Sequence, residues 1–180
     1  MTDQDLQQAN VSCARAACCS TLAWMLFLGT TVLGLAVDLW TKVLAVQHLK
    51  GAPPIQFIPG WLHFTFTENQ GAVFGIGQGK RVLFIAVSVA AVIFLTYLFA
   101  QSGRQRIYQL ILGMLLAGVL GNMWDRIWLG HVRDMIHALP RWPNFFPWIF
   151  NVADSLLCVG VFLMIAYSLV QPRKRASCAT

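Results

Sequence analysis

The sequence predicts an all-α integral membrane protein: four transmembrane helices in one domain over residues 1–180. Two observations favour this class: 57% of the residues are hydrophobic, and only 11% are charged. An average soluble domain is about 45–50% apolar and about 25% charged, so this chain lacks the charge to cover a soluble globule. The formal net charge of +6 would suit nucleic acid in a soluble protein. Here we expect membrane lipid with anionic headgroups as the counterpart, and no nucleic acid.

Four apolar stretches form the third observation. A helix of about 20 mostly apolar residues crosses the hydrocarbon core and satisfies its own backbone hydrogen bonds there. The predicted spans cover about residues 18–38, 82–100, 107–126 and 149–170, with outer loops over residues 39–81 and 127–148. The first stretch exceeds the apolar core of a usual signal peptide, and no small-x-small cleavage site follows it. We therefore expect a permanent helix.

The basic residues predict an orientation for these spans. Four crossings place both termini on one side, together with the short loop that carries Arg104 and Arg106. The tail Arg173-Lys174-Arg175 falls on the same side, and such clusters are typical of the cytoplasmic face. We therefore expect both termini in the cytoplasm. None of the five cysteines falls in the outer loops, so no disulfide framework is predicted.

Most ionisable side chains gather at the opposite, outer ends of the spans. Under this topology five of the seven acids and all four histidines fall there: Asp38, Glu68, Asp125, Asp134, Asp154, His48, His63, His131 and His137. Ionisable groups in or near a bilayer cost several kcal/mol and therefore mark functional sites. The distribution predicts a polar site at the outer membrane surface.

Spacing groups several of these residues on shared helix faces. Residues at i, i+3 and i+4 lie on one side of a helix, and this spacing relates Asp38 to Lys42, Asn122 to Asp125 and Arg126, and Asn151 to Asp154. The Asp38–Lys42 pair also suits a purely structural ion pair. Asp134 returns toward the helix ends after a short turn and could meet Asp154. Two close carboxyl groups share one proton, so one can activate a water while the other protonates a carbonyl.

The segment between the third and fourth spans carries the last predicted element. Residues 135–149 contain three prolines and four aromatic residues, and aromatic side chains favour the headgroup level. We expect a short interfacial helix followed by an irregular aromatic segment that lies over the site as a lid.

Four motifs in order give the chain a family resemblance over about residues 20–170. They are D-x-x-[ST]-K at 38–42, N-x-G-A-x-F at 69–74, G-N-x-x-D-R at 121–126, which is followed by Gly-His-Val-Arg-Asp at 130–134, and F-N-x-A-D-S at 150–155. With these motifs the sequence resembles the lipoprotein signal peptidases, also called signal peptidase II. Each motif alone is weak, whereas four in register are specific.

The resemblance implies roles for individual residues. Asp134 and Asp154 match the catalytic aspartate pair, and Asp38 and Lys42 match accessory positions. The residues that match the substrate pocket and its support are Asn69, Gly71, Asn122, Asp125, Arg126 and Asn151. Residues 53–75 resemble a small extracytoplasmic β-cradle, with strands expected over residues 55–58 and 62–67 around the turn Pro59-Gly60. Arg133 departs from the apolar residue usual beside the dyad and could shift its protonation.

The implied activity is removal of the signal peptide from diacylglyceryl-modified prolipoproteins. The resemblance implies a cut just before the lipid-modified cysteine by dyad-activated water, without a cofactor or metal. It implies a bacterial inner membrane, an active site near the outer face, and inhibition by globomycin-type cyclic peptides. Two alternatives use the same carboxylates. A metal-dependent membrane hydrolase would bind Zn²⁺ through His131, Asp134, His137 and Asp154; an ion-coupled transporter would line its path with Asp125, Arg126 and Asp154.

Overall fold

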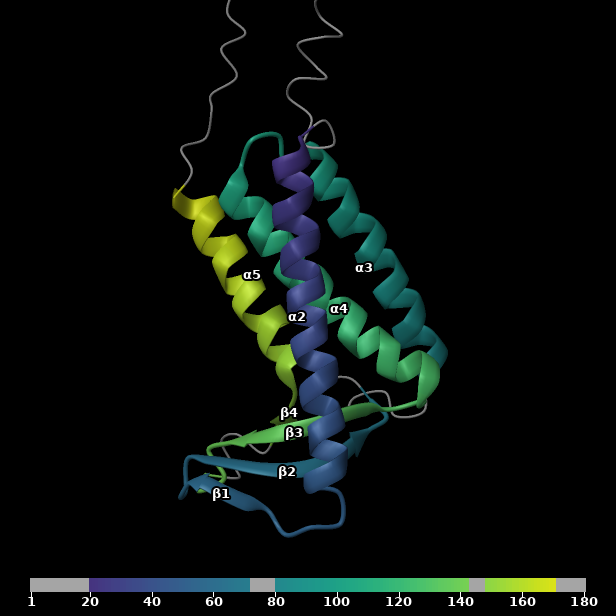
Figure 1. The fold of residues 1–180 in the computed structure, drawn as a ribbon, viewed down its shortest axis with the longest axis vertical. Helices are drawn as coiled ribbons and strands as arrows, with labels where there is room; N and C mark the ends of the chain where they lie inside the picture. Colours follow the sequence, from purple (N-terminus) through teal and green to yellow (C-terminus); the bar gives the residue numbers. More distant parts are fainter. Residues whose placement is uncertain (1–19, 72–79, 143–147, 171–180) are drawn as a thin grey trace, which may run out of the picture.

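The computed structural model describes residues 20–71, 80–142 and 148–170. Its helices are α2 (Thr21–His48), α3 (Arg81–Gln101), α4 (Arg106–Trp128) and α5 (Val152–Val170), and its strands are β1 (Ile55–Ile58), β2 (Leu62–Asn69), β3 (Val132–Ala138) and β4 (Ile149–Phe150). All four helices are long and apolar enough to cross a membrane, which confirms a multi-pass membrane protein. The sheet lies across one end of the helical bundle (Figure 1). Residues 18 and 19 of the first predicted span lie outside the described residues.

The first helix is longer than predicted. It continues to His48, about three turns beyond the expected end near residue 38. The prediction ended the span at its first charged residue, but Asp38 and Lys42 are fully buried, and Ala45 and Leu49 are buried too. These residues follow the spacing of one helix face. The extra turns carry α2 down to the sheet (Figure 1).

Helix α4 is the centre of the bundle, and glycines let its neighbours approach. It packs against α2, α3 and α5. A Cβ at Gly113 would meet the backbone carbonyl of Phe27 on α2, and a Cβ at Gly118 would meet that of Ala153 on α5. Small residues of this kind allow close packing in membrane helices, where no hydrophobic force drives association.

The described ends of the chain lie at the end of the bundle away from the sheet (Figure 1). There Phe27 and Phe99 stack with ring centroids 4.2 Å apart, in a core shared by α2, α3 and α4. Arg106 Nη1 donates to Ser20 Oγ at 3.4 Å. Tyr167 Oη donates to Gln105 Oε1 at 3.2 Å and ties α5 to the same corner. The opposite ends of α2 and α5, with the polar residues on them, lie near the sheet.

The sheet is antiparallel, with strand order β1-β2-β3-β4. Strands β1 and β2 confirm the two predicted strands, and β2 extends to Asn69. The short helix expected from residue 135 onward is wrong, because residues 132–138 form β3 and pair with β2. A two-stranded hairpin is marginal alone, and β3 adds Met135 to a small core with Ala45 and Leu49.

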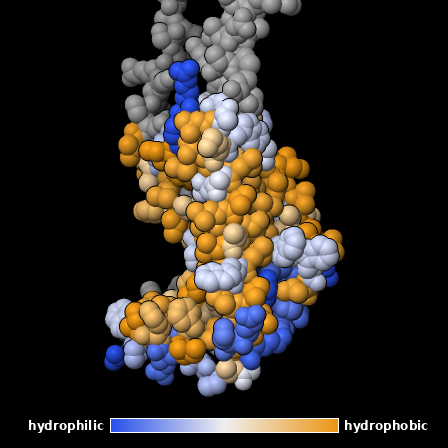
Figure 2. Space-filling model, viewed as in Figure 1, coloured by the Kyte–Doolittle hydropathy of each residue, from blue (hydrophilic) through white to orange (hydrophobic). Residues whose placement is uncertain are grey.

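The surface has the polarity that a membrane requires. Hydrophobic side chains cover most of the visible helical face, and hydrophilic ones gather toward the end that carries the sheet (Figure 2). Large apolar residues are strongly exposed on the outside of α3, including Val82 at 79% and Ile93 at 65%. These faces suit contact with lipid. Within the predicted lid, residues 143–147 lie outside the described residues.

Gly118 provides a test of the α4–α5 contact. In Gly118→Ala the new Cβ would lie 2.7 Å from both Ala153 O and Leu157 Cγ, so the helices must separate. We expect the free energy of unfolding in detergent to fall by about 1–3 kcal/mol. The matched control is Gly29→Ala, where nothing lies within 4 Å of the added Cβ. Alanine favours helix by about 1 kcal/mol, so the control should be neutral or stabilising. Equal thermal stability of the two variants would contradict this account.

Candidate active site

Asp134 lies in β3 and is almost fully buried, with 2% exposure. Both of its carboxylate oxygens accept hydrogen bonds from asparagine amides. Asn69 Nδ2 donates to Oδ2 at 3.0 Å, and Asn151 Nδ2 donates to Oδ1 at 2.6 Å. Asn69 comes from the neighbouring strand, where it pairs in register with Val132. The sheet therefore brings one donor to Asp134, and the connection into α5 brings the other.

Asp154 lies in the first turn of α5 and forms a capping box with Asn151. The N–H of Asp154 donates to Asn151 Oδ1 at 2.9 Å, and the N–H of Asn151 donates to Asp154 Oδ2 at 3.3 Å. Such reciprocal bonds satisfy backbone N–H groups that a helix start leaves without partners. Asn122 Nδ2 on α4 donates to the second oxygen, Asp154 Oδ1, at 2.8 Å. These bonds fix the Asp154 carboxylate at the helix end.

Asn151 connects the two acids. Its side chain bonds Asp134 through Nδ2 and the backbone of Asp154 through Oδ1. The same Nδ2 also donates to Asn122 Oδ1 at 3.2 Å. The structure thus brings together Asp134, Asp154 and three of the predicted supporting residues, Asn69, Asn122 and Asn151. They come from β3, α5, β2, α4 and the connection before α5.

The environment of Asp134 favours its neutral form. Burial, followed by the neighbouring Asp154 carboxylate, raises the pKa of Asp134 to about 7. The two asparagine hydrogen bonds and the charge of Lys42 act in the opposite direction but offset only part of the shift. A carboxyl group with this pKa is half protonated near neutral pH. The site can therefore hold one proton on two acids, the condition for acid–base work by a carboxyl pair.

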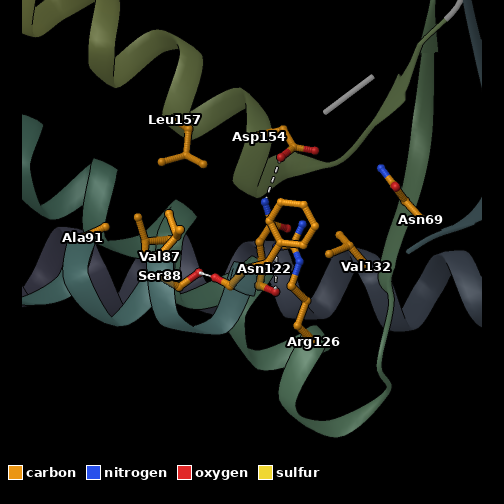
Figure 3. A pocket seen from close by; sticks show the side chains of 11 residues that line it. Asn69, Val87, Ser88, Ala91, Asn122, Arg126, Val132, Asp154 and Leu157 are labelled. Atoms are coloured by element: carbon orange, nitrogen blue, oxygen red, sulfur yellow. Dashed lines mark hydrogen bonds between the residues drawn. The ribbon is translucent and has the colours of Figure 1, made fainter. Parts of the chain in front are cut away.

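A cavity of about 210 Å³ opens beside Asp154 among α3, α4 and α5. Its polar end is lined by Asn69, Asn122, Arg126 and Asp154, and its apolar wall includes Val87, Ala91 and Leu157 (Figure 3). The side chains of Asp154 and Asn122 point toward one another at this polar end. A substrate in the cavity would meet the Asp154 side of the acid pair.

Arg126 is held at the edge of this cavity. Its Nη2 donates to the carbonyl of Gly71 at 2.9 Å, and its Nη1 donates to the carbonyl of Asn122 at 3.3 Å. The guanidinium lies over the ring of Phe84, 5.0 Å from its centroid. The N–H of Gly71 in turn donates to Asn69 Oδ1 at 2.9 Å. Gly71 thus enters the site through its backbone.

The remaining predicted residues form a buried charged group behind the acid pair. Asp38, Lys42 and Asp125 have fully buried side chains, and Lys42 Nζ lies 2.8 Å from Asp38 Oδ2 and 3.4 Å from Asp125 Oδ2. Arg133 also belongs to this group, since its Nη2 lies 2.6 Å from Asp125 Oδ1. Successive residues of a strand point to opposite faces. Arg133 therefore pairs with Asp125, whereas Asp134 joins the asparagines.

The four ligands considered for zinc are not assembled into one site. Across the described ranges 20–71, 80–142 and 148–170, no three His, Cys, Asp or Glu side chains form a group that could hold a metal ion. His131 Nε2 lies 3.8 Å from Glu68 Oε1, and His137 packs with its ring centroid 6.4 Å from that of His63. His137 lies in β3, and His131 directly precedes that strand.

The apolar wall of the cavity was missed by sequence reasoning. Phe84, Val87, Ser88 and Ala91 lie at helical spacing on one side of α3. A transmembrane helix is apolar all round, so hydrophobic periodicity does not mark its inward side. The hydroxyl of Ser88 gives no distinct signal either, because it donates to the carbonyl of Phe84 at 2.9 Å within its own helix.

Comparison with known proteins shows which family the chain belongs to. The family model described as signal peptidase (SPase) II matches residues 30–170. A lipoprotein signal peptidase of Caldanaerobacter subterraneus is 38% identical over 128 residues, which cover 71% of this chain and 85% of the relative. One from Enterococcus faecalis is 37% identical over 138 residues, covering 76% and 83%. A solved bacterial membrane enzyme superposes with a TM-score of 0.74 and 32% identity, covering 84% of this chain and 92% of its own.

Together, the helical membrane fold and these matches define a membrane peptidase of the aspartic type. More specifically, the chain belongs to the signal peptidase II family, as its four motifs had indicated. It is a protease, and its described residues hold four helices long and apolar enough to cross a membrane.

The raised pKa of Asp134 predicts how stability depends on pH. Between its unfolded pKa of 3.8 and its folded pKa of about 7, the folded state binds more protons than the unfolded state. Stability therefore falls as pH rises through this window, by about 1.4 kcal/mol per unit of pKa difference at most. We expect the thermal midpoint in detergent to drop between pH 5 and pH 8, and the drop to be smaller in Asp134→Asn.

The control for this titration is Glu68→Gln on the same sheet. The hydrogen bond from Lys50 lowers the pKa of Glu68, whose side chain is exposed. The control should therefore keep the wild-type decline in thermal midpoint above pH 5. If the thermal midpoint of Asp134→Asn declines with pH as much as that of wild type, the titrating group is a different residue.

Proposed function

We propose that this protein removes signal peptides from prolipoproteins, with Asp134 and Asp154 as its catalytic pair. The observation that supports this most strongly is the shared asparagine, Asn151, which bonds to both acids while Asp154 lines a cavity. The relatives named lipoprotein signal peptidases supply the substrate class. The cut falls just before a cysteine that carries a diacylglyceryl group.

In the proposed reaction the acid pair carries one proton and holds one water. Asp154 takes a proton from the water as its oxygen attacks the scissile carbonyl carbon. The proton held on Asp134 passes to the carbonyl oxygen, giving a neutral tetrahedral intermediate. When the carbon–nitrogen bond breaks, the proton on Asp154 goes to the leaving amine, and the hydroxyl of the intermediate returns its proton to Asp134. A pKa of about 7 for Asp134 keeps this proton available at neutral pH.

The surrounding residues bind and orient the substrate. Arg126 and Asn69 line the cavity and have the donors to hold backbone carbonyls of an extended peptide. A cavity of about 210 Å³ suits small side chains near the cut rather than two acyl chains. The acyl chains would lie in the bilayer outside it. Globomycin-type cyclic peptides would inhibit the enzyme by occupying the same cavity.

The proposed orientation follows the charge at the two ends of the bundle. Arg104 and Arg106 lie in and beside the loop between α3 and α4, at the end away from the sheet. Positive residues in a short loop favour the cytoplasmic side. We therefore propose cytoplasmic termini in a bacterial inner membrane, with the acid pair near the outer face. Water then reaches the site from outside, and a membrane-anchored substrate reaches it laterally.

Neutralising either acid tests the proposed pair. Asp134→Asn and Asp154→Asn should each lower cleavage of a diacylglyceryl-modified precursor by at least about 1,000-fold, because a carboxyl pair acts as a unit. The measurement is gel or fluorogenic cleavage by purified protein in detergent micelles. Thermal midpoints near wild type would show that both variants remain folded.

The control is Glu68→Gln, which removes an exposed carboxylate from the same sheet and should cleave at the wild-type rate. An unmodified precursor run in parallel tests the requirement for the diacylglyceryl group. Near-wild-type cleavage by folded Asp154→Asn protein would refute the assignment.

Chelation separates the acid pair from a metal mechanism. We expect cleavage to continue at an unchanged rate after EDTA treatment and dialysis, since the proposed steps use only protein carboxyl groups and water. Loss of activity with EDTA and recovery on adding Zn²⁺ would favour the metal-dependent alternative. An ion flux through liposomes that contain the purified protein would instead favour the transporter.

A further inference from the structure

A second, buried carboxylate supports the backbone next to each of the two proposed catalytic acids. Asp38 Oδ1 accepts the N–H of Ala153 at 2.8 Å. Asp125 Oδ2 accepts the N–H of Arg133 at 3.1 Å. In each case a fully buried carboxylate holds the residue immediately before a proposed catalytic aspartate.

One ammonium group joins these two supports. Lys42 Nζ lies 2.8 Å from Asp38 Oδ2 and 3.4 Å from Asp125 Oδ2, and its side chain is fully buried. It therefore links the start of α5, which carries Asp154, to the start of β3, which carries Asp134. The carboxyl groups of both acids are themselves held by asparagines, through side-chain amides and, at Asp154 Oδ2, through the backbone N–H of Asn151.

Lys42 also determines how Asn122 presents its amide. Lys42 Nζ donates to Asn122 Oδ1 at 3.1 Å and to the carbonyl of Gly121 at 3.3 Å. Because an ammonium group can only donate, the oxygen of the amide must face Lys42. The Nδ2 of Asn122 then faces Asp154 Oδ1, at a distance of 2.8 Å. A reversed amide would set two donors against each other and present an oxygen to the carboxylate.

We propose that Lys42 is a positioning residue that sets the placement of Asp134 relative to Asp154. It does so through Asp38, Asp125 and Asn122. The proposal rests on the proposed function, because it concerns the geometry of that acid pair. Lys42 is fully buried and does not line the cavity, so it acts on the reacting groups and not on substrate binding.

The charges around Asp134 make the pH dependence of cleavage a measure of this role, which simple loss of folding would not change. The charged groups that act on Asp134 are Lys42 from α2, Arg126 from α4 and Asp154 from α5. The Lys42 charge lowers the pKa of Asp134. Its removal should raise that pKa and move the alkaline limb of cleavage to higher pH, since the pair then keeps its proton longer.

The test uses Lys42→Met together with Asp38→Asn. The single Lys42→Met variant leaves two buried carboxylates with Arg133 as their remaining cation, which threatens folding. The double variant keeps the charge balanced, and the amide oxygen of the asparagine introduced in place of Asp38 can still accept the N–H of Ala153. It therefore removes the link between the two supports and keeps both supports in place.

We expect the double variant to remain folded but to cleave poorly. Small misplacements of reacting groups cost about 100-fold in rate, so kcat for a diacylglyceryl-modified precursor should fall by about 100-fold. KM should stay within about threefold because neither Lys42 nor Asp38 lines the cavity. The alkaline limb should move upward because Lys42, and not Asp38, is among the main groups that act on the pKa of Asp134. Lys50→Met is the control: Lys50 is an exposed cation paired with Glu68, and its loss should leave kcat, KM and the pH profile unchanged.

Three outcomes would overturn the proposal. The first is a folded double variant with kcat within threefold of wild type, and the second is a lowered kcat with an unmoved pH profile. The third is a double variant that cannot be obtained folded, which would assign Lys42 a role in folding. Failure of the proposed function can be distinguished from failure of the positioning role. In that case Asp154→Asn would remain active, whether or not Lys42 is changed. If Asp154→Asn is inactive and the double variant behaves as wild type, only the positioning role fails.

Discussion

The ion pair between Asp38 and Lys42, in the part of α2 nearer the sheet, is the interaction on which the rest of the site depends. Charges in a low-dielectric interior are stable only when they are paired and hydrogen-bonded. Here the signs alternate through Asp38, Lys42, Asp125 and Arg133, which come from α2, α4 and β3. The balance therefore requires that two helices and the sheet meet at one place. Gly121 on α4 permits the meeting, because a Cβ there would collide with the Asp38 carboxylate.

Asparagines separate this ionic group from the acid pair. Asn69, Asn122 and Asn151 donate to the carboxyl groups of Asp134 and Asp154 but add no charge. A lysine or arginine in direct contact would hold both acids ionised, and a fully ionised pair has no proton to give. The amides hold the carboxyl groups in place and leave burial to dominate, so the pKa of Asp134 rises to about 7. Lys42 acts on the pair from behind Asn122.

The sequence predicted the spans and the grouping of polar residues well, for physical reasons that also explain the errors. Long apolar runs require helices in hydrocarbon, and helical spacing correctly grouped Asn122 with Arg126 and Asn151 with Asp154. The end of α2 was misplaced because Asp38 looks like a boundary until its contact across the bundle, the backbone N–H of Ala153, is known. The second half of β3 was taken for the start of a helix because a seven-residue segment has little periodicity of its own. Its strand form depends on the free edge of β2, which is distant in sequence.

The arrangement of α3 fits the proposed function, in which one site serves a lipid-anchored peptide and water. Within the described chain, only Leu95 and Phe99 of α3 are buried, both toward the end away from the sheet. Near the sheet, α3 contributes a wall of the cavity, and Val87 in that wall is still 57% exposed. The wall therefore reaches the surface that faces hydrocarbon, whereas the acid pair is held at the level where α5 begins and the sheet crosses the bundle. In the proposed reaction, a peptide entering from the bilayer would meet apolar side chains first and then the carboxyl groups at the polar end, where the attacking water would be held.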